Sequence, residues 1–394
     1  MALTGLPDHR PLGPPGGLVP GLDLLSRPFP GLDPLALLTE RAGIAGLTRR
    51  GTVTCGGAGR LLRATDGWLA VSLPRPTDVD LVPAWLAGAS GPLASTTAPP
   101  SPLVADDRMW DHIAPAVAAR AVGELEDRGV LLGLAVAGVG SAPIREPVLR
   151  TSFGPQERPP TSRAPLVVDL SALWAGPLCG ALLGDAGATV IKVESSARPD
   201  GTRRGPLAFF DRLNAAKASV VVDLDDRAGV RTLRLLIEQA DVVVESSRPR
   251  ALRHLGIDAA AILSDPSTSP RVWVSITAHG RDGDPGRIGF GDDAAVAGAL
   301  VGDTESGPVF CADAVADPCA GLTAATATLD ALASGGRWLL DVALSAVAAS
   351  LAGPTLPVPP NLVATGPAPP PPSPTSPIMG FDTARVLQQL GPSR

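Results

Sequence analysis

The stretch PLVVDLSALWAGPLCGALLGDAGATVIKVE (residues 165–194) carries the pattern that decides the fold. It predicts a short apolar strand over 165–170, a helix over 173–186 that Gly187 can end, and a second strand over 189–194. The same alternation continues along the chain, with a strand, an amphipathic helix and two more strands expected at 219–224, 225–240, 241–245 and 271–277. Strands that alternate with helices of this length favour an α/β fold, with a parallel sheet covered by helices on both faces.

Length and proline content divide the chain into parts. Its 394 residues are enough for two or three domains. Proline-rich stretches at 89–102, 141–165 and 353–377 cannot hold a helix or a central strand. The predicted organisation is a Pro/Gly-rich N-terminal segment (1–34), a small α+β domain (35–140), a linker (141–164), the large sheet domain (165–352), a proline-rich linker (353–377) and a C-terminal segment (378–394).

The small domain carries weaker signals than the large one. The DG turn at 66–67 leads into an expected strand over 66–73, and a helical pattern runs over 108–128, with Gly129 as its expected end. Together these segments predict a smaller α+β unit.

Composition and motifs exclude several classes of protein. The net charge of −6, with no long basic block, argues against nucleic-acid binding. There is no GxGxxG after the first strand, no GxxxxGK[ST], no GxSxG and no HExxH, and the four cysteines do not have the spacing of a zinc site. We therefore expect no metal. No signal peptide is recognised and no apolar run reaches the roughly 18 residues of a membrane helix, so the cytoplasm is the expected location.

The segment VADPCAGL (315–322) places a carboxylate at the start of a helix. Asp317 is expected as the N-cap and Pro318 as the first helical residue, before an Ala/Leu-rich helix that runs to about residue 333. The helix dipole is expected to keep Asp317 ionised near neutral pH, as a carboxylate nucleophile needs. Residue types alone leave two interpretations open, a nucleophile and a plain cap, and favour the cap because caps are far more common.

Several segments, in order, resemble the class III CoA-transferase family, which also contains acyl-CoA racemases. The segment 167–194 is similar to the family's first strand, helix and second strand, including its AGP. Further similar segments follow in the family's order: LNAAKASVVVDL (213–224), ADVVVESSRPRALRHLGID (240–258), VSITAHGRDGDPG (274–286), ADP (316–318) and LLDVALSAVAASL (339–351). The resemblance implies a Rossmann-like large domain and a homodimer.

The resemblance also implies an activity. In the family, the Asp at the position of Asp317 accepts the acyl group of an acyl-CoA as a mixed anhydride. The released CoA then forms an aspartyl-CoA thioester, from which a carboxylic acid collects it. Coenzyme A is thus expected as a substrate, with no tightly bound cofactor. With the resemblance, the nucleophile becomes the favoured interpretation of Asp317.

The resemblance further implies a CoA site and a glycine loop. Candidate contacts to CoA are Arg203, Arg204, Lys217, Arg248, Arg253, His254 and Leu255. Any single arginine of this set has an equally good interpretation as a solvated surface residue. The loop at Gly56, Gly57 and Gly59 resembles the family's glycine-rich loop over the nucleophile, and a plain turn is an equal alternative.

Two departures from the family pattern keep other functions open. The segment that resembles the small domain (55–139) precedes the large domain, so the chain resembles a circularly rearranged member. The racemases pair the Asp with a His, but residues 289–293 (GFGDD) contain none, and His279 lies too early and is interpreted as an ordinary loop residue. The alternatives are a racemase or lyase-type relative, and a catalytically silent acyl-CoA-binding paralogue.

Overall fold

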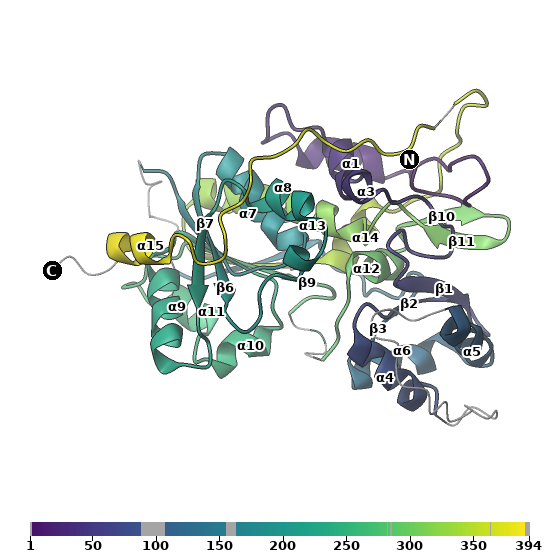
Figure 1. Ribbon diagram of the computed structural model, residues 1–394, viewed down its shortest axis with the longest axis horizontal. Helices are drawn as coiled ribbons and strands as arrows, with labels where there is room; N and C mark the ends of the chain where they lie inside the picture. The colour runs from purple at the N-terminus through teal and green to yellow at the C-terminus, as the bar shows by residue number, and fades with distance from the viewer. Residues whose placement is uncertain are drawn as a thin grey trace.

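The computed structural model describes residues 2–87, 107–154, 163–281, 283, 286–362 and 364–390. Its largest unit is a seven-stranded sheet with the spatial order β4-β12-β9-β8-β5-β6-β7 (Figure 1). The strands are parallel to their neighbours except β4, which runs antiparallel to β12 at one edge. The bounds are β4 (Val148–Ser152), β5 (Leu166–Asp169), β6 (Thr189–Ser195), β7 (Ala218–Val222), β8 (Val242–Glu245), β9 (Val272–Thr277) and β12 (Trp338–Ala343).

The six parallel strands have the order of a Rossmann fold. Numbered along the chain, they lie as 3-2-1-4-5-6, with β5 as the first strand. After β5 the chain adds β6 and then β7 on one side of β5. It then crosses back and adds β8 on the other side of β5. In such a sheet, ligands bind outside the carboxyl ends of the strands where the order reverses, which here is between β5 and β8. The predicted α/β class and Rossmann-like large domain are confirmed.

The central strands are buried on both faces because their side chains alternate between two cores. Val167 and Val242 contribute to one apolar cluster, and the adjacent Val168 and Val243 to the other. β-branched residues suit such fully covered strands. One face is covered by α7 (Ala175–Asp185), α8 (Leu207–Asn214), α13 (Ala316–Ser334) and α14 (Leu344–Leu351), and the other by α9 (Arg227–Gln239), α10 (Pro249–His254), α11 (Ala259–Ser264) and α15 (Thr383–Leu390).

Helix α13 packs closely on α7. A Cβ at Gly321 would lie 2.7 Å from the carbonyl oxygen of Ala175, so the glycine permits this approach. The start of α13 therefore lies beside the loop that follows β5. A short 3-10 helix, η1 (Gly201–Arg204), follows β6, and α12 (Gly291–Ala297) packs on α14.

The small unit is a three-stranded antiparallel sheet with three helices. It consists of β1 (Gly59–Arg63), β2 (Trp68–Ser72), α4 (Pro76–Trp85), α5 (Asp107–Ala118), α6 (Val122–Leu132) and β3 (Ala135–Gly138). The helix expected over 108–128 is two helices, because the Val122 N–H donates to Asp66 (2.8 Å) and starts a new helix there. Gly129 does not end α6, since it lies inside the helix, where a Cβ would come within 2.1 Å of the Val136 side chain.

The N-terminal segment, which here extends to residue 45 and so beyond the predicted 1–34, lies on the large unit rather than on the small one. Helices α1 (Leu18–Leu25), α2 (Pro34–Leu37) and α3 (Glu40–Ala45) pack near α13, α14 and α8, and the hairpin β10 (Val301–Thr304) and β11 (Gly307–Phe310) lies beside β1. The segment 141–164, expected as a linker, contributes β4. The proline-rich stretch at 89–102 lies outside the described residues.

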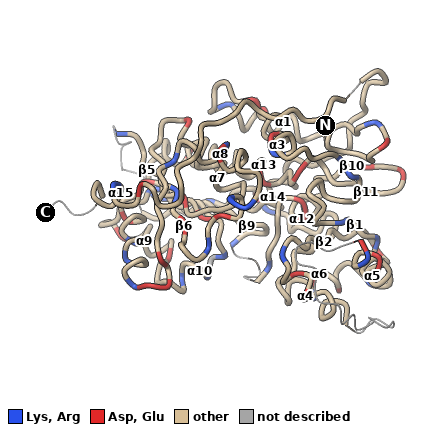
Figure 2. The backbone as a smooth tube through the Cα atoms, viewed as in Figure 1, with Lys and Arg blue, Asp and Glu red and all other residues tan. Residues whose placement is uncertain are grey.

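The proline-rich segment near the C-terminus is extended over the surface. From 364 to 376 every third residue faces the protein and the two between are exposed, which is the repeat of a polyproline II helix. It passes close to α3, where the carbonyl oxygen of Ala368 leaves no room for a Cβ at Gly43. Charges of both signs are interspersed along the described chain (Figure 2), and none of its helices is long and apolar enough to cross a membrane.

Two buried lysines form ion pairs beneath the sheet's carboxyl edge. Lys217 Nζ lies 2.8 Å from Asp169 Oδ2 and donates to the Pro177 carbonyl, and Lys192 Nζ lies 2.9 Å from Asp200 Oδ2. All four side chains are nearly inaccessible to solvent. Lys217, predicted to contact CoA, is thus used inside the protein, where it fixes the end of β5 to the start of α7.

We predict that Lys217→Met lowers the free energy of unfolding by about 3 kcal/mol, because it leaves Asp169 buried with one cation fewer. Urea unfolding followed by circular dichroism measures this. The control is Arg234→Met, which removes a surface pair with Glu238 and is expected to cost less than about 1 kcal/mol. Equal losses in the two variants would contradict the ion-pair interpretation.

Candidate active site

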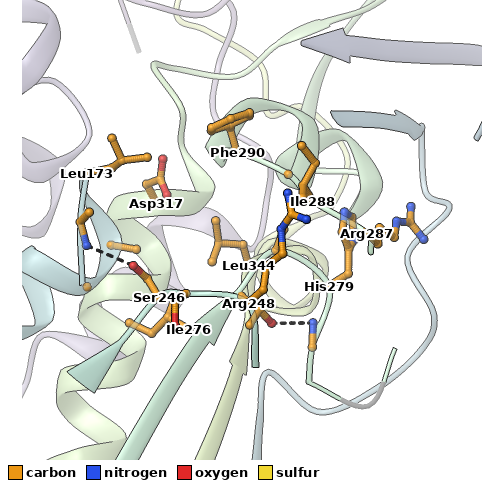
Figure 3. A pocket seen from close by; sticks show the side chains of 18 of the residues that line it. Leu173, Ser246, Arg248, Ile276, His279, Arg287, Ile288, Phe290, Asp317 and Leu344 are labelled. Carbon is orange, nitrogen blue, oxygen red and sulfur yellow. Dashed lines mark hydrogen bonds between the residues drawn. The ribbon is translucent and has the colours of Figure 1, made fainter. Parts of the chain in front are cut away.

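A cavity of about 260 Å³ opens at the carboxyl edge of the sheet (Figure 3). The loops after β5, β8, β9 and β12 line it, together with the segment before α12 and the first turn of α13. Asp317 lies on one side of it, near Leu173, and His279 and Arg287 lie on the other. Four loops meet here because parallel strands bring all their carboxyl ends to one edge.

Asp317 is the second residue of α13, not its N-cap. The helix starts earlier than expected because the Asp317 N–H already donates to the Ala314 carbonyl (2.9 Å), which makes Val315 the cap. Pro318 is still tolerated, since the amides of a first turn have no partner within the helix. The carboxylate approaches Gly291 closely, where a Cβ would lie 2.5 Å from Oδ2 of Asp317.

Burial, rather than the helix dipole, sets the protonation of Asp317. Burial raises its pKa to about 7, and the nearby Asp293 and Asp313 carboxylates add to the shift, while Arg41 and the Gly291 backbone oppose it. The helix start was expected to keep this group ionised near neutral pH, and burial acts against that effect because it favours the neutral carboxylic acid. A dipole contribution of roughly 1 kcal/mol is too small to offset the loss of water.

Asp317 belongs to a group of four carboxylates. Burial raises the pKa of Asp292 to about 8 and that of Asp293 to about 7. Asp292 accepts from the Ala314 N–H (2.9 Å), and Asp293 accepts from the Phe290 N–H (3.0 Å). Groups this close titrate together, so an observed pKa belongs to the group as a whole.

His279 lines the same cavity, although the sequence suggested an ordinary loop residue. The residue is 8% exposed, and the only hydrogen-bonding group that acts on its ring among the described residues is the Ile288 backbone, which opposes the shift of its pKa. Burial and the charge of Arg287 lower its pKa to about 3, so the imidazole is neutral. The sequence does place His279 directly after the predicted strand that became β9. The carboxyl ends of parallel strands meet at the ligand-binding edge of such a sheet, so this position could have marked His279 as a candidate site residue.

Arginines surround the cavity opening, and three of them were missed from the sequence. Arg281 pairs with Glu245 (2.7 Å), Arg287 with Glu126 (3.0 Å) and Arg75 with Asp78 (2.5 Å). The predicted Arg248 also lines the cavity, and no carboxylate partner is found for it among the described residues. Partial burial and the charges of Arg250 and Arg75 lower its pKa, which marks a region of uncompensated positive charge.

The other residues predicted to contact CoA do not line the cavity that contains Asp317. Arg203 pairs with Glu194 (2.6 Å) and stacks on Phe210. Arg253 is 59% exposed on its side chain and pairs with Asp258 (3.1 Å), outside both cavities described here. Arg204 and His254 are exposed. Leu255 lines a second cavity.

The second cavity, of about 720 Å³, adjoins the first. Ala172, Ser246 and Ser247 line both, so the two cavities lie next to each other along the carboxyl edge. The remaining lining comes from the ends of β5, β6 and β7 and from α9 and α10, including Leu170, Ser195, Arg198, Val222, Leu224 and Leu255.

The predicted glycine loop lies against the segment that precedes Asp317. The Cys55 thiol donates to the Ala312 carbonyl (3.3 Å), which fixes the loop to that segment. Gly57 has a φ of +83° and Gly59 packs closely on Thr54 and Ser72. None of Gly56, Gly57 and Gly59 lines the cavity that contains Asp317.

Within the described residues, no group of three or more His, Cys, Asp or Glu side chains is arranged to hold a metal ion. The four carboxylates of the group that contains Asp317 are therefore considered as titrating groups and not as ligands.

Comparison with known proteins gives curated relatives over the large unit. A succinate–glutarate CoA-transferase of Agrobacterium fabrum is 32% identical over 213 residues, which are 48% of this chain and 52% of the relative. A succinyl-CoA:glutarate CoA-transferase of Mus musculus is 33% identical over 169 residues, 40% of this chain and 38% of the relative. The chain spans about half the length of the curated relatives it matches, or less.

Among solved structures, a CaiB/BaiF family protein from Brucella suis is similar, with 30% identity, a TM-score of 0.43, and coverage of 47% of this chain and 53% of that one. The family model described as CoA-transferase family III matches residues 165–383. This match covers more than half of the chain, which therefore belongs to CoA-transferase family III.

Proposed function

We propose that this protein moves CoA between an acyl-CoA and a carboxylic acid, with Asp317 as the acyl acceptor. The observation that carries the proposal is the position of Asp317, which lines a cavity that adjoins a larger one at the carboxyl edge of a Rossmann-like sheet, where such folds bind ligands. Family membership over 165–383, which includes Asp317, supports it.

CoA would lie along both cavities. The nucleotide fits the larger cavity, and the pantetheine arm would pass Ser246 and Ser247 to reach Asp317. Arg248, at the same passage, supplies a cation for a phosphate group, and its lack of a carboxylate partner among the described residues leaves it free for one.

The proposed reaction needs no other reagent. A carboxylate oxygen of Asp317 attacks the thioester carbonyl, the C–S bond breaks, and a mixed anhydride and CoA thiolate result. The thiolate attacks the aspartyl carbonyl, which releases the first acid and leaves aspartyl-CoA. The second acid attacks this thioester to give a new anhydride, and the thiolate then attacks its acyl carbon, which restores the Asp317 carboxylate.

For the acids, we propose short dicarboxylates. The smaller cavity has room for a short chain, and arginines lie across it from Asp317 (Figure 3). The two relatives described above are named for succinate and glutarate. A second negative charge on the acid would be attracted by these arginines.

His279 favours one second candidate function, exchange of the proton on the α-carbon of an acyl-CoA. The neutral imidazole of His279 lines the same cavity as Asp317, so it would act as a second base beside that carboxylate. Figure 3 shows the two side chains on opposite sides of the cavity. Entry of solvent deuterium at the α-carbon without CoA transfer would support this candidate.

A homodimer and a cytoplasmic location are also proposed. Both rest on the resemblance of this chain to family members and on its composition. Sedimentation of the purified chain tests the first, and localisation of a tagged chain tests the second.

Asp317→Asn is expected to lower CoA transfer from succinyl-CoA to glutarate by at least about 10³-fold, because the amide cannot act as the acyl acceptor. Chromatography of the CoA esters measures the transfer. In the parent protein, hydroxylamine should convert the acylated Asp317 to a hydroxamate that mass spectrometry locates.

Three results separate the alternatives. Transfer by Asp317→Asn at the parent's rate would remove this residue from the reaction. Thermal stabilisation by CoA with no turnover in the parent would indicate a silent binder. CoA affinity should be unchanged in Asp317→Asn, which shows that the variant is folded.

The kcat/KM for transfer should rise with pH, about tenfold per unit below pH 7, and level off above about pH 8. The rate rises with pH because only the ionised carboxylate attacks the thioester. Since the pKa of Asp317 is raised to about 7, protonation removes this ionised form at lower pH. Initial rates in buffers of constant ionic strength measure this. A rate that is independent of pH from 5.5 to 8 contradicts the assignment.

Arg248→Met should weaken CoA binding by about tenfold at low salt, and less at high salt, because the lost attraction is between charges. The matched control is Arg253→Met, which removes an exposed arginine five residues further along the chain and leaves both cavities intact. Calorimetric titration with CoA compares them. Equal affinities at low salt would exclude Arg248 from the CoA site.

A further inference from the structure

A side chain from the N-terminal segment reaches the residues that precede Asp317. Arg41, in α3, lies outside the part of the chain that matches the family model. Its Nε donates to Oδ2 of Asp313 (2.8 Å), and a second guanidinium nitrogen pairs with the other carboxylate oxygen. The guanidinium carbon also lies 5.1 Å from the ring centre of Trp174, at the start of α7. Asp313 is completely buried, so the pair is shielded from water on its acidic side.

The segment that Arg41 contacts is strained. Ala312 and Ala314 have φ values of 53° and 45°, in the left-handed region that residues with a Cβ rarely adopt. Such a conformation persists only where the surroundings hold it. Besides Arg41, Thr4 and Cys55 bind Ala312 and Asp292 binds the Ala314 amide, and the segment leads directly into Asp317.

Arg41 is also a counter-charge for the carboxylate group. It opposes the rise in pKa of both Asp292 and Asp317. The other titratable groups around Asp317 come from several elements: Asp293 from α12, Asp313 from the preceding segment, Cys319 from the next turn of α13, and His279 across the cavity. Of these, the carboxylates raise the pKa of Asp317 and the histidine is neutral.

We propose that Arg41 is a positioning residue for the acyl acceptor: it pairs with Asp313 while it lies over the Trp174 ring, holds the strained segment that leads into Asp317, and places a positive charge beside the carboxylate group. The role of Asp317 as acceptor rests on the proposed function, but the effect of Arg41 on its charge does not. The two can therefore be tested separately.

The neighbouring residue on α3 provides a matched control. Glu40 pairs with Arg212 of α8 (2.9 Å) and fixes the same helix to the large unit without contacting the segment before α13. Arg212→Met should weaken the attachment of α3 to the large unit about as much as Arg41→Met does. Unlike Arg41→Met, it leaves the positive charge of Arg41 in place.

The test is a carbon-13 NMR titration of aspartate carboxyl groups in the full chain, with Asp317→Asn identifying the Asp317 signal. Arg41→Met should raise the titration midpoint by about one pH unit, and Arg212→Met should leave it within about 0.2 units. Asp313→Asn should lower it, because it removes a negative charge and releases Arg41 to act on Asp317. The proposal thus expects the two variants, each of which breaks the same ion pair, to shift the titration midpoint of Asp317 in opposite directions. If the pair were merely structural, both variants would shift that midpoint in the same direction.

Rates provide the second readout. At pH 7, Arg41→Met should lower kcat for CoA transfer by about tenfold with KM for acyl-CoA within twofold, and Arg41→Lys, which keeps the charge, should recover part of the loss. If Arg41→Met does not fold, Asp313→Asn still decides the matter, because the proposal requires it to lower the titration midpoint of Asp317. An unchanged midpoint in the Arg41 and Asp313 variants would overturn the proposal, and absence of transfer in the parent would overturn the proposed function instead.

Discussion

A carboxylate removed from water stays ionised near neutral pH only where opposite charge and hydrogen bonds replace the lost solvation, and this requirement organises the region around Asp317. Burial and two neighbouring carboxylates push its pKa up, and Arg41 and the Gly291 backbone oppose them. Arg41 and the Gly291 backbone thus favour the ionised form of Asp317, while burial and the neighbouring carboxylates favour the neutral form.

The order of the strands explains why this group faces a cavity. The connections leave β5 in one direction and return at β8 on its other side, so their loops diverge at the carboxyl edge. The two cavities share the residues at this divergence, Ala172, Ser246 and Ser247. Glycine at 321 lets α13 approach α7 closely enough to bring Asp317 to the same edge.

Local patterns predicted the large sheet well. The strands expected at 165–170, 189–194, 241–245 and 271–277 are β5, β6, β8 and β9, because runs of β-branched residues bounded by turns depend on neighbours in sequence. The split between α5 and α6 was missed, since the hydrogen bond that starts α6 comes from Asp66, far away in the sequence. Predicted CoA contacts such as Arg203 and Lys217 instead pair with acidic residues whose positions depend on the fold.

The sequence by itself determined the α/β class, the family resemblance and the choice of Asp317, because strand and helix periodicity and ordered motifs are properties of neighbouring residues. The tertiary structure alone decided the burial that raises the pKa of that aspartate, the presence of His279 in its cavity and the ion pair between Arg41 and Asp313. Burial and long-range electrostatic attraction depend on which segments the fold brings together, and no pattern along the chain records that residue 41 lies beside residue 313.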